Sequence, residues 1–219
     1  MAVKDFMTKK VVYVSPDTTV AHATDIMRDR KLRRLPVIEN DQLVGIVTEN
    51  TISEASPSKA SSLSIYEMNY LLNKTKIKDV MIKDVVTVSR YADLEEAAFL
   101  MIKHNVGVLP VVDNDQVYGI ITDKDIFKAL LEISGFGQAG IRIRLLTEDG
   151  VGILEGITAI LADQKLNIKR MIASSRKSGK IAVEIQLDGQ VDQSDLKAQF
   201  EALGIEVESI EETQERGDL

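Results

Sequence analysis

The sequence predicts an α+β fold in which two β-α-β-β-α repeats pack as a pseudo-two-fold pair and a separate βαββαβ unit follows. Three observations lead to this prediction. Residues 3–52 align without a gap with residues 77–126 at a constant offset of 74 residues, and about two positions in five are identical. Glycines cluster directly after the second copy, and a different strand and helix pattern then begins. A repeated unit seldom buries its apolar face alone, so the two copies should pack against each other.

Each copy is expected to begin with a short β-rich run, at residues 11–14 and 85–88. A helix follows in each copy, and in the second copy Asp93 is suited to cap it, with Glu96 as its capping-box partner. Apolar residues then recur at helical spacing, which predicts a buried helix face. These residues are Val20, Ala23 and Met27 in the first copy and Leu94, Ala97, Ala98 and Met101 in the second.

A hairpin is expected next, because two apolar runs, 35–38 and 43–47, are separated by the polar turn residues 40–42. The second helix of each copy should begin near Thr48 or Thr122. Residues 53–62 form a loop by composition. A helix over 63–73 should then direct apolar side chains toward a core, namely Ile65, Met68, Leu71 and Leu72.

The third unit has the element order of a ferredoxin-like split βαβ fold. Ile141, Ile143 and Leu145 alternate with Arg142 and Arg144, which predicts a strand with one solvated face. A turn over 148–152 precedes a helix with Leu154, Ile157, Ile160 and Leu161 directed inward. The remaining elements are expected as strands at 167–173 and 181–187, a helix at 193–203 and a last strand at 205–210.

These patterns give an expected domain organisation. It comprises a first repeat with its following loop (1–63), a connecting helix (64–76), a second repeat (77–134), a glycine-rich linker (135–140), the third unit (141–212) and an acidic tail (213–219). The tail is expected to be a solvated segment, and the alternative is an acidic arm that binds a partner.

Composition excludes several classes of protein. The net charge of −7 argues against a nucleic-acid partner, and the absence of cysteine excludes disulfides and thiolate metal sites. The N-terminus does not resemble a signal peptide, and no apolar run is long enough to span a membrane, so the cytoplasm is the expected location. We expect no catalytic residues and no metal site, because the two histidines occupy non-equivalent positions and no hydrolase or nucleotide-phosphate motif occurs.

Candidate binding residues lie where the second copy passes from strand to helix. Gly119 would let the backbone pass close to a neighbour or a ligand. Thr122 is expected at a helix N-terminus, where free N–H groups favour an anion, and Asp125 could accept hydrogen bonds from two ribose hydroxyls. Ordinary helix capping by the same residues is the alternative.

The motifs LPV(V/I), GI(I/V)T and T-x-x-D in two copies resemble a tandem cystathionine-β-synthase (CBS) domain pair, or Bateman module, over about residues 1–134. The resemblance implies a module that binds an adenosine-containing ligand between its repeats. Asp125 would hold the ribose, Thr122 would contact ribose or phosphate, and apolar side chains and backbone would contact the adenine. The implied nucleotide-binding set is Val85, Thr87, Val106, Gly107, Val108, Leu109, Pro110, Thr122, Lys124 and Asp125.

The first copy departs from this pattern, because Thr51 aligns with Asp125 and a hydroxyl cannot replace a bidentate carboxylate. One complete and one weakened or repurposed site are therefore expected. Arg33 and Arg34, together with Thr48, form a candidate phosphate or second site, since guanidinium groups suit phosphate oxygens. The alternative is a solvated basic helix end.

The third unit resembles an ACT domain, because residues 149–154 and 166–168 are similar to the motifs D-x-P-G-x-L and G-(I/V)-N-I of that family. This resemblance implies a candidate effector site for an amino acid. The residues concerned are Asp149, Gly150, Val151, Gly152, Ile153, Leu154 and Asn167. Alternatively, Gly152 only permits close packing and the domain serves assembly without a ligand.

The order of the modules resembles acetoin-utilisation AcuB-type proteins. Together the resemblances imply a regulatory protein that is not an enzyme and that forms a homodimer. Its expected ligand is AMP, ADP, ATP, NAD, S-adenosylmethionine or cyclic-di-AMP, with Mg²⁺ accompanying ATP, and it has no prosthetic group. The alternative is a scaffold for dimerisation or interaction that needs no ligand.

Overall fold

The computed structural model describes residues 1–55 and 64–217. The chain divides into two compact units, Met1–Phe127 and Lys128–Leu219, and each is described by itself. The division falls inside helix α5 (Asp123–Ser134), shortly before the glycine-rich segment 135–140.

The first repeat contains the predicted helix, hairpin and second helix. Its hairpin turns at Asn40 and Asp41, which both have positive φ, as a two-residue type I′ turn requires. The second helix includes residues 53–55, for which composition predicts a loop, while 56–62 lie outside the described residues. The elements up to the connecting helix are η1 (Val3–Asp5), α1 (Val20–Arg30), β1 (Arg34–Glu39), β2 (Gln42–Thr48), α2 (Glu49–Ala55) and α3 (Ile65–Lys74).

The second repeat has the same elements in the same order. Its hairpin turns at Asn114 and Asp115, which again have positive φ. Its elements are η2 (Ile77–Asp79), α4 (Leu94–His104), β3 (Val108–Asp113), β4 (Gln116–Thr122) and α5 (Asp123–Ser134). The predicted β-run before the first helix of each copy is reduced to one bridge, Val14 with Val37 and Val88 with Val111, because the chain leaves the hairpin after a single pairing.

Among the described residues the two hairpins join into one four-stranded sheet in the order β1-β2-β4-β3, linked where Gln42 pairs with Gln116. The predicted helix stripes are buried at Val20, Ala23 and Met27 in the first copy and at Leu94, Ala97 and Met101 in the second, while Ala98 is only partly buried. They pack with apolar strand residues, each of which contributes about 1.5–3 kcal/mol when fully buried. The fully buried strand residues include Leu35, Val37, Val47, Leu109, Val111 and Ile121.

The N-terminal segments of the two repeats pair with the opposite copy. Thr8, near the start of the first repeat, bridges to Ile120 in β4 of the second repeat. Ile82, near the start of the second repeat, bridges to Ile46 in β2 of the first repeat. Each segment therefore lies on the sheet of the other copy, and this exchange interlocks the pair.

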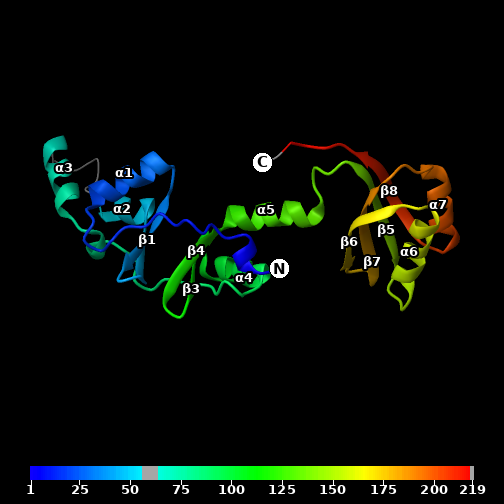
Figure 1. Cartoon of the computed structure of the whole chain (residues 1–219), viewed down its shortest axis with the longest axis horizontal. Helices are drawn as coiled ribbons and strands as arrows, with labels where there is room; N and C mark the ends of the chain where they lie inside the picture. The colour runs from blue at the N-terminus through cyan, green and yellow to red at the C-terminus, as the bar shows by residue number, and fades with distance from the viewer. Residues whose placement is uncertain (56–63, 218–219) are drawn as a thin grey trace. The chain divides into compact units, whose positions relative to one another are not determined.

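The second unit has the predicted βαββαβ order. Its elements are β5 (Gly140–Glu148), α6 (Ile153–Asp163), β6 (Asn167–Ser175), β7 (Lys180–Asp188), α7 (Gln193–Ala202) and β8 (Glu206–Thr213). The described strands form one antiparallel sheet in the order β6-β7-β5-β8. Helices α6 and α7 lie on the same side of this sheet (Figure 1).

Strand β5 of this unit has one apolar and one polar face, as predicted. Ile141, Ile143 and Leu145 are buried in the core. Arg144 lies on the other face, where its guanidinium is 3.2 Å from Glu184 and 3.1 Å from Glu211. The charged face is therefore held by ion pairs between neighbouring strands.

Several local predictions were wrong. Asp93 is the N-cap residue of α4, but its side chain makes no capping bond, and its carboxylate lies 3.7 Å from the N-terminal ammonium instead. Leu71 and Leu154 are exposed at 38% and 43%, because they lie at the edge of their helix faces. Gly152 has φ of +87°, and a Cβ added to it would meet no atom within 4 Å, so glycine is required here by backbone conformation and not by close packing.

Candidate functional site

A cavity of about 370 Å³ lies within the first unit, between the first and the second repeat. Its floor comes from the end of β2 and the start of α2, and its walls come from the segments 82–86 and 105–108. Its lining comprises Arg33, Arg34, Ile46, Thr48, Glu49, Asn50, Ile82, Asp84, Val85, Val86, Asn105, Val106, Gly107 and Val108.

The position of the cavity depends on Gly45. A Cβ at this residue would lie 2.6 Å from Sδ of Met81 and 2.9 Å from the carbonyl oxygen of Ile82. Without a side chain there, Ile82 forms two backbone hydrogen bonds of 2.9 Å with Ile46. The crossing segment then continues through residues 84–86 along the edge of the cavity. Gly119 has the same role in the second copy, where Met7 and Thr8 approach it, so the predicted close neighbour is protein backbone.

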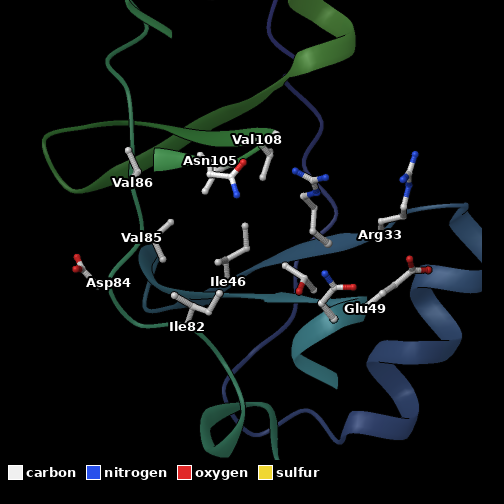
Figure 2. A pocket seen from close by; sticks show the side chains of 14 residues that line it. Arg33, Ile46, Glu49, Ile82, Asp84, Val85, Val86, Asn105 and Val108 are labelled. Atoms are coloured by element: carbon white, nitrogen blue, oxygen red, sulfur yellow. The ribbon is translucent and has the colours of Figure 1, made fainter. Parts of the chain in front are cut away.

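The cavity has an apolar part and a charged part. Figure 2 shows Ile46, Ile82 and Val85 gathered on one side, with Val108 and Asn105 opposite them. Arg33 lies on one flank of this group and Asp84 on the other, directed away from it (Figure 2). Apolar surface flanked by cations suits a ligand with a flat apolar ring and an anionic group.

Neither arginine of the cavity forms an ion pair among the described residues, although the carboxylate of Asp123 lies near Arg34. Arg33 is exposed and Arg34 is half-buried. Within residues 1–55 and 64–217, neither guanidinium forms an ion pair or a side-chain hydrogen bond. Gly107 makes room for Arg34, since a Cβ at residue 107 would lie 3.2 Å from Nη1 of Arg34 and 2.9 Å from Oδ2 of Asp123.

Thr122 and Asp125 are hydrogen-bonded to each other at the start of α5. Oδ2 of Asp125 accepts hydrogen bonds from the backbone N–H of Thr122 at 2.8 Å and from its hydroxyl at 2.7 Å. Within the part of the chain that the structure describes, Oδ1 of Asp125 forms no hydrogen bond or ion pair. One carboxylate oxygen therefore caps the helix while the other is free to accept.

The corresponding residues of the first copy repeat this arrangement with a hydroxyl. The backbone N–H of Thr48 donates to Oγ1 of Thr51 at 2.9 Å, and Oγ1 of Thr51 donates to the carbonyl of Thr48 at 3.0 Å. The backbone N–H of Thr51 donates in turn to Oγ1 of Thr48 at 3.1 Å. The Thr51 hydroxyl is thus occupied by local capping bonds.

Only some of the residues predicted to bind a nucleotide lie together at the cavity. Val85, Val106, Gly107 and Val108 line the cavity together with Arg33, Arg34 and Thr48. Thr122, Lys124 and Asp125 do not line it, because the N-terminal segment of each repeat crosses onto the other copy. Leu109 and Pro110 are buried in β3, and Thr87 lines a separate hollow with Lys83 and Asp115.

Sequence reasoning missed part of the lining. The missed residues are Ile46, Glu49, Asn50, Ile82, Asp84 and Asn105. Glu49 and Asn50 could have been found from the repeat alignment, because they precede Thr51 as Asp123 and Lys124 precede Asp125. Ile82 and Asp84 carry no such signal, since only the crossing of the chain brings them to the first repeat.

The candidate effector residues of the second unit are not brought together. The turn Asp149–Gly152 follows Glu148, which pairs with Lys180 at one end of the sheet. Asn167 pairs with Asp188 at the opposite end. The two positions are eight residues apart along β7, or roughly 26 Å at about 3.3 Å per residue. One copy of the chain therefore does not build a site from both.

The described residues contain no group of three or more His, Cys, Asp or Glu side chains placed to hold a metal ion. No helix described in the structure combines the length and apolar character needed to cross a membrane. His22 and His104 are exposed on their helices.

The CBS domain family model matches residues 3–58 and 77–132, slightly more than half of the chain. An inosine-5′-monophosphate dehydrogenase from Methanocaldococcus jannaschii is 39% identical over 123 residues, which are 55% of this chain and 22% of that protein. Of several curated relatives that it matches, the chain spans between 21% and 46% of the length.

Solved structures match the repeat pair as well. A Vibrio cholerae protein assigned to acetoin utilization (AcuB) has a TM-score of 0.53 at 32% identity, covering 63% of this chain and 98% of that one. The crystal structure of CBSX2 in complex with AMP has a TM-score of 0.50 at 30% identity, covering 60% of this chain and 97% of that one.

Proposed function

The chain belongs to the CBS-domain family, and from that premise we propose that it is a non-catalytic regulatory protein that senses an adenosine-containing nucleotide. The ligand binds in the cavity between the repeats, with its base among Ile46, Val85 and Val108 and its phosphates toward Arg33 and Arg34. A likeness to a CBS protein crystallised with AMP supports the choice of ligand.

The observation that carries this proposal is a cavity lined by both repeats in which two arginines lack acidic partners among the described residues. Its volume of about 370 Å³ lies within the range of small-molecule sites, about 300–1,000 Å³. A phosphate group would give the guanidinium groups charge-assisted hydrogen bonds that they do not have within the described protein.

A sensing role requires that ligand affinity differ between two states of the protein. The segment 82–86 of the second repeat could make ligand affinity depend on conformation, because Ile82, Asp84, Val85 and Val86 line the cavity and the chain then continues into helix α4. A bound ligand would fix this segment against β2 and α2, and the second repeat would respond through its own first turn. Helix α5 begins in the second repeat and ends in the C-terminal compact unit, so the two units are joined through one helix.

Thr122 and Asp125 remain part of the proposal as a second position for a nucleoside, because Oδ1 of Asp125 is free to accept from a ribose hydroxyl. We also propose that the second unit is an ACT-like module for dimerisation or amino-acid sensing. Its strand order supports this assignment. Because Gly152 and Asn167 lie at opposite ends of one sheet, a ligand that contacts both would need two chains.

Isothermal titration of the full chain with AMP, ATP, NAD, S-adenosylmethionine and cyclic-di-AMP tests the function. Val85→Trp should fill the cavity and weaken binding there at least about tenfold, or roughly 1.4 kcal/mol. The matched control is Val11→Trp, because Val11 occupies the same position in the first copy and does not line the cavity.

The alternative function is a scaffold that dimerises without a ligand. Binding of no member of the panel, with the wild-type chain folded, would favour the scaffold and contradict the sensor. Equal affinities in the wild type and in Val85→Trp would remove the cavity from the proposal. Asp125→Ala should reduce the stoichiometry of any second binding event and leave the cavity event in place.

A further inference from the structure

We propose that the cavity recognises its nucleotide by phosphate charge and not by the ribose diol, so that it accepts 2′-deoxynucleotides as readily as ribonucleotides. This inference rests on the proposed function and adds a rule for ligand choice at the same site. The reason is that the arginines at the cavity have hydrogen-bond donors left unused within the described protein, whereas the hydroxyl that replaces Asp125 is already hydrogen-bonded.

Selective recognition of a cis-diol needs an acceptor with free lone pairs directed at both hydroxyls, which a carboxylate supplies. The equivalent position in the first copy is Thr51, which follows the lining residues Glu49 and Asn50 but does not itself line the cavity. Its hydroxyl donates to the Thr48 carbonyl at 3.0 Å and accepts from the Thr48 N–H at 2.9 Å and from the Thr48 hydroxyl at 3.4 Å. A diol that donated to Thr51 would have to displace one of these bonds. The first copy therefore keeps the helix cap of the second copy and loses the free oxygen that Asp125 retains.

The two arginines at the cavity, unlike the Thr51 hydroxyl, have hydrogen-bonding capacity that no described side chain uses. Arg28, Arg90 and Arg144 are each within 3.5 Å of an aspartate or glutamate oxygen. Arg33 and Arg34 have no such partner among the described residues, although both line the cavity. Planar guanidinium groups pair with phosphate oxygens in a bidentate way, so each phosphate charge adds binding energy here.

Two carboxylates at the cavity are the competing acceptors for a ribose. Asp84 is exposed and points away from the apolar group (Figure 2). Glu49 is exposed in the first turn of α2, and its counterpart Asp123 is also acidic, so an acid at this position does not distinguish the two copies. Glu49 is therefore the residue whose substitution must be included in the test.

Isothermal titration of the full chain with adenosine, AMP, 2′-deoxy-AMP and ADP tests the proposal. Repeating it in Asp125→Ala prevents the carboxylate of the second copy from contributing. AMP and 2′-deoxy-AMP should bind within about twofold of each other, and adenosine should bind at least about tenfold more weakly. Arg34→Gln should weaken AMP at least about tenfold and change adenosine little, whereas Arg28→Gln should alter neither, because Arg28 is paired with Asp25 outside the cavity.

A gain-of-function variant completes the test. Thr51→Asp copies Asp125 and should create a preference for AMP over 2′-deoxy-AMP of about fivefold or more. The proposal is overturned if the Asp125→Ala chain, in which only the cavity can select the ribose, binds AMP more than about twofold more tightly than 2′-deoxy-AMP. Loss of that preference in Glu49→Gln would then identify Glu49 as the diol acceptor. Either result leaves the proposed function intact, which fails only if none of the nucleotides binds.

Discussion

The two copies differ in one functional group at the residue where their second helices are capped. Asp125 offers a carboxylate with one oxygen in the cap and one free, while Thr51 offers a hydroxyl that is fully engaged. The backbone geometry of the cap is retained in both copies. Sequence alignment alone identified this exchange, but only the hydrogen bonds show that the donor and both acceptor sites of the Thr51 hydroxyl are engaged by Thr48.

An ion pair between Asp17 of the first repeat and Lys78 of the second repeat affects the pH dependence of stability. Nζ of Lys78 lies 2.8 Å from Oδ1 of Asp17, and this hydrogen bond, followed by the charge of Lys78, lowers the pKa of Asp17. The same contact raises the pKa of Lys78. Stabilisation from Asp17 is thus present above its pKa in the unfolded chain and is lost as pH falls through the lower pKa of the folded chain.

Asp17→Asn should reduce the loss of stability on acidification, because the depressed carboxyl pKa is removed. Urea unfolding between about pH 2 and pH 6 measures the slope of the free energy of unfolding. Lys78→Met should reduce the same slope, and the double variant should match either single variant. An unchanged slope in both single variants would show that the pair does not contribute in solution.

Among the secondary-structure elements, the crossing segments decide how the repeats are joined. Gly45 and Gly119 are the points where a backbone strand passes within contact of a strand from the other copy. Both glycines stand in the repeated GI(I/V)T motif, so the sequence indicates a close approach at these positions. It does not indicate what approaches, because the partner lies far away along the chain.

Gly45→Val should lower the free energy of unfolding by about 1–3 kcal/mol, because the new Cβ would overlap Met81 and the carbonyl of Ile82. Urea denaturation measures this change. Gly156→Ala is the control, since a Cβ there meets Leu203 at an ordinary 3.5 Å in the middle of α6. That variant should be neutral or more stable by up to about 1 kcal/mol. Wild-type stability in Gly45→Val would contradict the crossing.

The element predictions succeeded where a local pattern determines the structure. The stripes of Val20, Ala23 and Met27 and of Leu94, Ala97 and Met101 are buried, and both hairpins turn at the predicted polar residues. The capping box expected at Asp93 is absent, and one forms at Ser64 with Glu67 instead, where Ser64 N–H donates at 2.7 Å. Capping depends on side-chain rotamers and neighbours that a sequence motif does not specify.

In the molecule as a whole, the cavity and the second unit belong to separate compact units. A ligand that binds only the folded form stabilises the unit that contains its site. Ligand binding should therefore act on the repeat pair directly. Any response of the C-terminal unit would be transmitted by coupling and not by contact with the cavity.

A nucleotide present at about a hundredfold excess over its Kd should raise the free energy of unfolding of the first unit by about 2.7 kcal/mol. Differential scanning calorimetry of the full chain checks this, with the transition of the second unit as an internal reference. At the same nucleotide concentration Val85→Trp should reduce the shift to about 1.4 kcal/mol or less, because a filled cavity binds at least about tenfold more weakly. A shift of the same size in that variant would place the ligand elsewhere.

The repeat, the βαββαβ order that follows it, and the difference between Asp125 and Thr51 could all be read from the amino-acid sequence, because each depends on residues close together in the chain or on a fixed offset. Which predicted residues share a site became clear only from the folded chain. The N-terminal segment of each repeat crosses to the other copy, so Val85 lines a cavity with Thr48 and the arginines and not with Thr122. Such a pairing is set by backbone hydrogen bonds between distant segments, which have no side-chain pattern of their own.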